Sequence, residues 1–158
     1  MSAREVIARL ALQPHPEGGW YREFYRSSTR VRGPAGDRSA LTSIHFLLEQ
    51  HQISRWHIVE SDEVWHFYAG APLELFSYEP DTSSLRRHVL SAPEISDSAS
   101  VAVIPRRVWQ AARTLGDYSH VGCSVGPGFD FCDFSFVSAL PDHARHFKVQ
   151  LKELASLL

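Results

Sequence analysis

The chain has 158 residues, the size of one compact domain, and its 44% hydrophobic and 22% charged residues are ordinary for a soluble globular protein. Sixteen basic and eighteen acidic residues leave a net charge of −2 without a basic tail, which argues against a nucleic-acid partner. No apolar run approaches the length of a membrane span, and the N-terminus lacks the continuous apolar stretch of a signal peptide. We therefore expect a cytoplasmic protein without membrane or nucleic-acid partners.

The predicted elements begin with a short helix over residues 2–12, where Ser2 and Glu5 fit a capping box and Pro14 ends the helix. Short segments rich in aromatic and β-branched residues then alternate with turn formers. Strands are expected at residues 20–25, 41–48, 53–58, 63–68, 73–78, 86–90, 101–104, 108–113, 118–125 and 131–137. A closing helix is expected over residues 142–158. This order predicts an all-β sandwich or barrel, one domain over residues 1–158 with its core at about 14–137.

A stretch beginning at His57 resembles the first cupin motif, in which two histidines, a glutamate and a glycine recur at fixed spacing. His57, Glu63 and Gly70 fall on that spacing, and Val59 stands where the second histidine would be. In the second motif, Gln110 occupies the place of the histidine. The spacing of both motifs is kept, while two of the usual metal-binding histidines are replaced.

A wider pattern over roughly residues 10–137 resembles one branch of the cupin superfamily, the Cupin_5-like branch long catalogued as a domain of unknown function. The segments that carry it are residues 16–23, 42–48, 56–57 with 62–70, 105–112 and 121–131. The resemblance implies a double-stranded β-helix, or jelly roll, usually a homodimer, to which the predicted helices add short N- and C-terminal elements. It also implies a pocket like that of the dTDP-4-keto-6-deoxyglucose epimerases, which share the fold and use no metal.

Strand alternation suggests which side chains share the interior. Every second side chain of a strand faces the same way, so Arg55 and His57 share one face, and Glu63 and Trp65 share another. Combined with the cupin spacing, this predicts that His57 and Glu63 face the barrel mouth and that Gln110 approaches them from a neighbouring strand. A carboxylate beside His57 would favour the imidazolium and raise its pKa, which suits proton transfer near neutrality. We expect His57 as the base and Glu63 as its orienting partner.

Further residues complete the predicted site. The expected ligand-binding residues are Gln110, Trp65, Tyr21, Arg55 and Glu17. The only metal set that the motifs offer is His57, Glu63 and Gln110, and an amide oxygen is a weak ligand for zinc or iron. We therefore expect no cofactor, or at most a weakly held divalent metal.

The predicted function is binding of a small polar or carbohydrate-like ligand inside the barrel. If the protein is an enzyme, proton-transfer chemistry is favoured, namely isomerisation or epimerisation. Two alternatives stay open: a metal-dependent lyase or oxygenase, and a non-catalytic small-molecule binding protein.

Other residues have structural interpretations. Gly18 and Gly19 are expected to form a turn into the first strand. His66 and Tyr68 alternate away from the interior and are expected in the outer sheet surface or in a homodimer interface, because a C2 partner is the usual protection for exposed sheet edges. The two cysteines are expected to be buried thiols.

Overall fold

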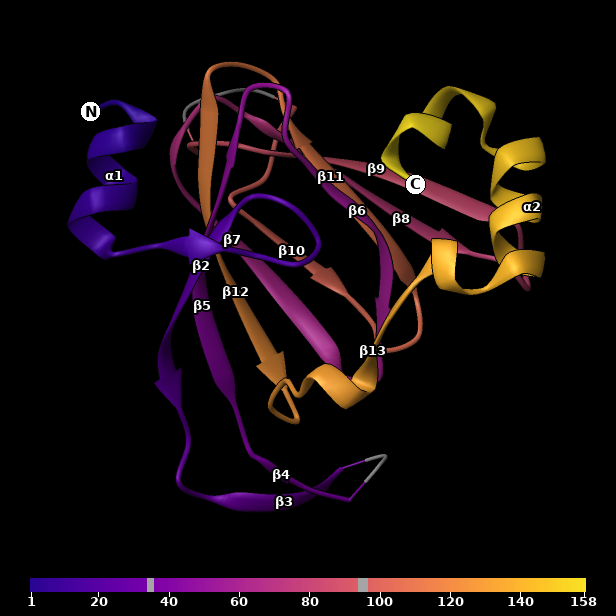
Figure 1. The fold of residues 1–158 in the computed structure, drawn as a ribbon, viewed down its shortest axis with the longest axis horizontal. Helices are drawn as coiled ribbons and strands as arrows, with labels where there is room; N and C mark the ends of the chain where they lie inside the picture. The colour runs from indigo at the N-terminus through magenta and orange to yellow at the C-terminus, as the bar shows by residue number, and fades with distance from the viewer. Residues whose placement is uncertain (34–35, 94–96) are drawn as a thin grey trace.

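The structure is a computed structural model that describes residues 1–33, 36–93 and 97–158, and its core is a pair of antiparallel sheets (Figure 1). The six-stranded sheet runs in the order β1 (Gln13–Pro14), β2 (Trp20–Arg26), β5 (Thr42–Glu49), β12 (Tyr118–Gly126), β7 (Asp62–Gly70) and β10 (Val101–Ile104). The five-stranded sheet runs β13 (Phe134–Phe136), β6 (Ile53–Val59), β11 (Trp109–Thr114), β8 (Leu73–Glu79) and β9 (Ser84–Leu90). A separate hairpin joins β3 (Arg30–Gly33) to β4 (Gly36–Ser39).

Short helices lie at both ends of the chain, on opposite sides of the molecule in Figure 1. They are α1 (Ala3–Leu10) and α2 (Pro141–Gln150), with the 3₁₀ segments η1 (Phe131–Asp133), η2 (Val137–Ala139) and η3 (Lys152–Leu157). The predicted capping box begins α1, since the backbone N–H of Ser2 donates to Glu5 Oε2 at 2.7 Å and the Glu5 N–H donates to Ser2 Oγ at 3.4 Å. Among the described residues, no helix is long and apolar enough to cross a membrane.

Two hydrophobic clusters divide the interior. The first lies between the sheets and joins Phe46 and Trp65 of the six-stranded sheet to Leu75 of the five-stranded sheet. The second lies on the other face of the five-stranded sheet, where Trp56 packs edge-on against Phe147 of α2 with ring centroids 5.1 Å apart. Each large apolar side chain buried in this way contributes roughly 1.5–3 kcal/mol. Strand β6 therefore turns Trp56 toward α2 and leaves its alternate residues for the space between the sheets.

The predicted jelly roll is confirmed, and the strand predictions differ from the structure mainly near the C-terminus and at the hairpin. The strand expected at residues 131–137 is reduced to β13, flanked by η1 and η2. The single closing helix expected at residues 142–158 is also wrong, because α2 ends at Gln150 and η3 follows. Leu151, Leu154 and Leu157 are all buried at a spacing of three, which is the repeat of a 3₁₀ helix.

Candidate functional site

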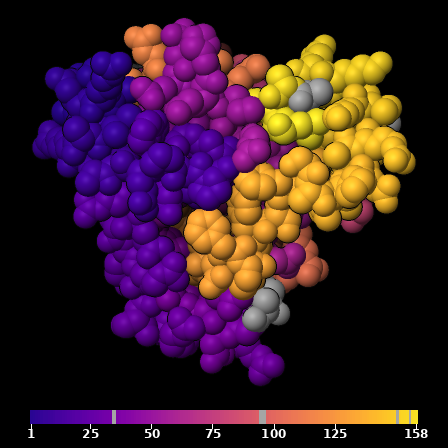
Figure 2. Space-filling model, viewed as in Figure 1, coloured from indigo at the N-terminus to yellow at the C-terminus, as the bar shows by residue number. Residues whose placement is uncertain are grey.

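A cavity of about 480 Å³ lies between the two sheets, within the range of small-molecule sites. It is lined by Gln13, His15, Glu17, Tyr21, Arg22, Glu23, Arg26, Thr42, Ile44, His57, Val59, Glu63, Cys123, Val125, Phe129, Asp130, Phe131 and Phe134. The turn before β2 and the segment between β12 and β13 meet at this site, and their atoms lie side by side on the face shown in Figure 2. There the His15 ring stacks on Phe131 with centroids 6.2 Å apart.

The turn before β2 brings two of the lining residues to the cavity. Gly18 and Gly19 both have positive φ, 111° and 75°, and a Cβ on Gly18 would lie 2.0 Å from the Ile53 carbonyl oxygen. Only glycine allows this turn to lie directly on β6. The expected turn is therefore present, and its close contact with β6 carries His15 and Glu17 into the interior. The Arg55 N–H donates to the Glu17 carbonyl at 3.1 Å and holds the two segments together.

His57 is 2% exposed, and both of its ring nitrogens have defined neighbours. Its Nδ1 lies 2.7 Å from the Arg55 carbonyl oxygen, which can only accept, so Nδ1 carries a proton. Its Nε2 lies 3.4 Å from Glu17 Oε2. The Glu17 carboxyl also accepts a hydrogen bond from Ser54 Oγ at 2.9 Å. The carboxyl nearest to the reactive nitrogen of His57 is thus Glu17, while the backbone of Arg55 fixes the ring.

Burial shifts the pKa values of His57 and Glu17 in opposite directions. Desolvation lowers the pKa of His57, although the nearby Glu63 carboxylate and the bond to the Arg55 carbonyl oppose this. Desolvation also raises the pKa of Glu17, against the effects of His15 and Ser54. The predicted rise in the pKa of His57 is therefore wrong, because the cost of burying the imidazolium exceeds the attraction of its neighbours. The two pKa values therefore shift in opposite directions, and at 3.4 Å a protonated Glu17 carboxyl can donate to the unprotonated Nε2 of His57.

A chain of hydrogen bonds from residues outside the cavity lining orients the Glu63 carboxyl group. Gln110 Nε2 donates to Glu63 Oε2 at 2.6 Å, and Trp65 Nε1 donates to Gln110 Oε1 at 3.0 Å. The Cys123 thiol also hydrogen-bonds Glu63, and burial raises the pKa of that thiol, which keeps it protonated as a donor. Burial raises the pKa of Glu63 too. Glu63 lines the cavity, whereas Gln110 and Trp65 lie behind it and orient its carboxyl group.

The remaining predicted ligand-binding residues lie in different places. Tyr21 lines the cavity and packs edge-on against His15, with ring centroids 4.5 Å apart. Arg55 does not line it, because its guanidinium donates to the Pro16 carbonyl at 2.6 Å and stacks over Phe136. The sequence reasoning missed His15. Its signal was the spacing of two residues from Glu17 within a proline-flanked turn.

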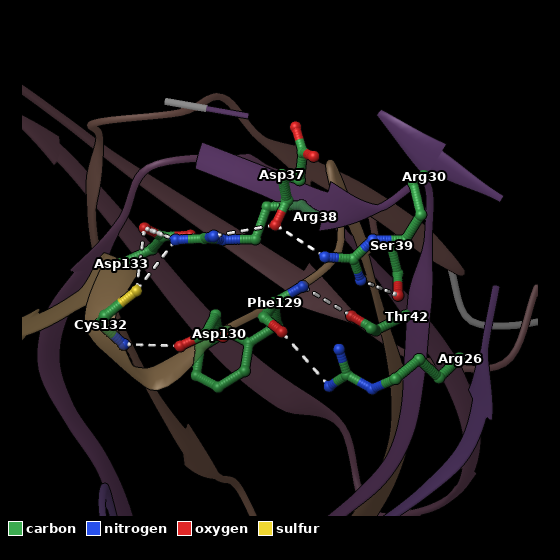
Figure 3. A network of polar contacts seen from close by, with 10 residues as sticks. All are labelled: Arg26, Arg30, Asp37, Arg38, Ser39, Thr42, Phe129, Asp130, Cys132 and Asp133. Carbon is green, nitrogen blue, oxygen red and sulfur yellow. Dashed lines mark hydrogen bonds and ion pairs between the residues drawn. The ribbon is translucent and has the colours of Figure 1, made fainter. Parts of the chain in front are cut away.

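An aromatic wall was also missed, formed by Phe129, Phe131 and Phe134. It belongs to the segment predicted in part as a strand, and Figure 3 shows how the hairpin fixes that segment. Arg38 of β4 donates to both carboxylate oxygens of Asp133, at 2.8 and 3.0 Å. The hairpin thereby positions the wall from outside the cavity.

The predicted metal set does not fit a metal ion. The Gln110 amide oxygen accepts the Trp65 indole N–H, and Gln110 does not line the cavity. Val59 lines it at the position where the motif would supply a second histidine. Over the described ranges, no three His, Cys, Asp or Glu side chains are placed to hold a metal.

The outer face of the six-stranded sheet carries an exposed aromatic patch. Tyr68 and Phe24 are 46% and 50% exposed, and His45 Nδ1 lies 3.2 Å from His120 Nε2 beside them. Burial and the neighbouring His45 lower the pKa of His120 to about 4, so His120 is uncharged at neutral pH. The homodimer predicted to use this face stays a prediction. Sedimentation velocity at micromolar concentration should give twice the monomer mass, and a monomer alone would contradict it.

The two cysteines differ from each other. Cys123 is buried at the cavity, as expected. Cys132 is exposed, so its predicted burial is wrong. It lies in η1, where the Asp130 side chain accepts its N–H at 3.0 Å and keeps this turn at the surface.

Glu17→Gln is expected to stabilise the protein more at about pH 8 than at about pH 4. Because the pKa of Glu17 is raised in the folded state, its stabilising contribution is present at low pH and is lost as the pH rises through that value. The amide can still accept from Ser54 and can donate to His57 Nε2. Thermal denaturation across this range is the measurement. An equal change in melting temperature at both pH values would contradict the raised pKa of Glu17.

Glu5→Gln is the matched control for this experiment. A backbone hydrogen bond from Ser2 lowers the pKa of Glu5, so the stabilising effect of that carboxylate is present above its ordinary pKa and is lost on acidification. The two variants should therefore change the pH dependence of stability in opposite directions.

Two facing antiparallel sheets that enclose a cavity, with His57 and Glu63 at the motif spacing on its wall, define a cupin. The model of the Cupin_5 family, described as cupin superfamily (DUF985), matches residues 4–137. The chain belongs to the Cupin_5 family.

Solved structures agree with this assignment. A hypothetical protein from Leishmania major is 30% identical, with a TM-score of 0.85 over 97% of this chain and 98% of that chain. A protein from Shewanella oneidensis is 31% identical, with a TM-score of 0.85 over 100% of this chain and 97% of that chain. Oxalate decarboxylase from Bacillus subtilis shares the fold alone, at 11% identity and a TM-score of 0.60 over 92% of this chain and 36% of that chain. The comparison with curated proteins gave no match.

Proposed function

We propose that this cupin binds a small polar, carbohydrate-like ligand in its barrel and moves a proton on it, in an isomerisation or an epimerisation. The observation that carries the proposal is the contact between His57 Nε2 and Glu17 Oε2 at 3.4 Å on the cavity wall. The His57 ring is fixed by the Arg55 carbonyl, so Nε2 is the nitrogen available for chemistry.

A proton shared between two buried groups suits this chemistry. General acid–base catalysis is most efficient when the proton affinity of the base is close to the working pH, and burial raises the pKa of Glu17 in that direction, while it lowers the pKa of His57. The buried Glu63 carboxyl lies near enough to influence the pKa of His57 and would stabilise an imidazolium formed during turnover. Its orientation is set by Gln110.

The cavity wall supports a carbohydrate-like ligand. Carboxyl groups of Glu17 and Glu63 can accept hydrogen bonds from ligand hydroxyls, while Phe129 and Phe134 offer apolar surface to the C–H face of a sugar-sized molecule. Arg26 lies at the cavity but is held by a two-point ion pair with Glu23, at 2.7 and 2.8 Å. Glu17 and Glu63 are buried, whereas Arg26 and the other arginine of the lining, Arg22, are exposed.

The test is proton exchange from solvent. The full-length protein is incubated in D2O with a panel of neutral aldoses and ketoses, and NMR follows deuterium entering carbon positions. Matched sugar alcohols, which lack an acidic C–H bond, are the control. Exchange in the sugars alone is the expected result. Saturable binding without exchange would indicate a non-catalytic binding protein in place of an enzyme. The absence of both binding and exchange would overturn the proposal.

A further inference from the structure

His15 and His57 lie on either side of the Glu17 carboxyl, and the backbone fixes opposite tautomers in them. A backbone N–H can only donate, so the 3.2 Å bond from the Glu17 N–H requires His15 Nδ1 to be unprotonated. The proton of the neutral His15 ring is then on Nε2. In His57 the carbonyl of Arg55 places the proton on Nδ1 instead. One ring offers a donor to its surroundings, while the other offers an acceptor.

The surroundings of His15 keep it neutral and in place. Its side chain is 6% exposed and packs edge-on against Tyr21 and Phe46, with centroids 4.5 and 5.8 Å away. Burial lowers the pKa of His15, while the nearby Glu17 opposes this effect and His57 adds to it. Within the described part of the chain, no residue accepts a hydrogen bond from Nε2. A cavity-lining ring therefore has a polar N–H without a protein acceptor.

We infer that His15 Nε2–H donates to a carbonyl oxygen of the ligand, and that the substrate is a neutral hydroxy-ketone or hydroxy-aldehyde. The inference rests on the proposed proton transfer and names its substrate class. During the reaction the carbonyl oxygen gains negative charge. A neutral imidazole can stabilise that charge by donating a hydrogen bond from Nε2–H while it keeps its proton.

The step balances without any further reactant. The C–H bond next to the carbonyl breaks, its electron pair forms a C=C bond, and the carbonyl π electrons move to the oxygen held by His15. The carboxyl of Glu17 takes up the released proton as the shared proton settles on His57 Nε2. Isomerisation is completed when a proton returns to the former carbonyl carbon, the hydroxyl on the first carbon becomes the new carbonyl, and that hydroxyl proton passes to the oxygen held by His15. Epimerisation is completed when a proton returns to the other face of the first carbon.

The charges at the site favour a carbonyl over a carboxylate ligand. The two arginines of the lining, Arg22 and Arg26, are exposed and already donate to the Leu10 carbonyl and to Glu23. Glu17 and Glu63 are 6% and 7% exposed, so a ligand carboxylate beside them would meet two acidic groups away from solvent. A neutral hydroxycarbonyl compound instead presents hydroxyl donors to these carboxyls and one acceptor oxygen to His15.

The first test measures the tautomer and does not depend on activity. Long-range ¹H–¹⁵N NMR of the full chain with labelled histidine should show His15 protonated at Nε2 and unprotonated at Nδ1, with the signal assigned by its loss in His15→Gln. The Nδ1-protonated tautomer, or an imidazolium at neutral pH, would overturn the inference and leave the proposed function standing.

The second test uses two matched variants in the exchange assay with dihydroxyacetone and glyceraldehyde. His15→Phe keeps an aromatic ring against Tyr21 and Phe46 but removes the donor, and its kcat for exchange should fall roughly 10²-fold. His15→Gln can accept from the Glu17 N–H and donate from its amide, so it should retain more activity than His15→Phe. Circular dichroism and thermal melting verify that both variants fold.

The outcomes separate the two proposals. Exchange that His15→Phe leaves unchanged, or a glutamine variant as impaired as the phenylalanine variant, would overturn the role of His15 alone. Lactate and tartrate are added to the same assay as α-hydroxy acids, and exchange confined to them would overturn the substrate class and leave proton transfer in place. No exchange in any compound would overturn the proposed function and the substrate class together.

Discussion

His57→Asn is expected to reduce proton exchange by at least about 10²-fold while the protein stays folded. The asparagine amide can stand where Nδ1 stands in histidine and donate to the Arg55 carbonyl, which accepts at 2.7 Å in the native chain. What the variant lacks is Nε2, the atom 3.4 Å from Glu17. The NMR exchange assay, combined with a thermal melt, measures both effects. Native-level exchange in this variant would show that His57 is not part of the base.

His57→Ala is the comparison that shows why the asparagine variant is needed. The alanine variant leaves the Arg55 carbonyl without its donor and removes a ring that stacks on Phe134 with centroids 5.1 Å apart. A buried acceptor left unpaired costs roughly 1–3 kcal/mol. The His57 ring is only 2% exposed, so it also contributes to the packing of the interior. Loss of activity in the alanine variant alone therefore mixes stability with chemistry.

Alternation and spacing located part of the site because they are local properties of the chain. Strands β6 and β7 follow each other along the chain but lie in opposite sheets, and both present a side chain, His57 or Glu63, to the cavity. The period of two together with the cupin spacing predicts this. The partner of His57 depends on a contact across the fold. Glu17 reaches it only because the turn at Gly18 lies against β6, and no local pattern in the sequence indicates which strand will receive that turn.

The role of Gln110 could not be predicted from the sequence either, because it also depends on a contact between distant residues. The second motif correctly brings it beside Glu63, but a glutamine can line a cavity or support another residue from behind. In the structure Gln110 supports Glu63, because the Trp65 indole N–H donates to the Gln110 amide oxygen at 3.0 Å and holds the amide away from the cavity. The same limit applies to His15, because its tautomer follows from one backbone hydrogen bond.

The fold was predictable where hydrophobic periodicity is strong. Strands β5, β8 and β12 are rich in buried residues and were predicted within a residue or two of their ends. The hairpin of β3 and β4 was not predicted, since Arg30, Arg32, Asp37 and Arg38 leave it without an apolar face. Polar contacts position it instead, and the sequence does not show which charged residues will pair.

Asp133→Ala is expected to lower the Tm by roughly 5–10 °C. Asp133 is 5% exposed and accepts two hydrogen bonds from Arg38, which is 8% exposed and also donates to Cys132 Sγ at 2.9 Å (Figure 3). Removing the carboxylate takes two charge-assisted hydrogen bonds from a buried guanidinium, which costs more than the loss of an exposed pair. Differential scanning calorimetry of the full chain measures the change.

The matched control is Asp142→Ala, which removes the same side chain from an ion pair at the surface. Asp142 lies 3.8 Å from Arg145, and both side chains are largely exposed, so the Tm should change by no more than about 2 °C. The double variant Arg38→Met/Asp133→Leu should recover part of the stability lost in Asp133→Ala, because it replaces both buried charged groups by apolar side chains of similar volume. Because η1 carries Phe131 of the cavity wall, Asp133→Ala should also weaken ligand binding, whereas Asp142→Ala should not. Equal Tm values for the two single variants would show that the Arg38–Asp133 pair does not hold the hairpin against the wall.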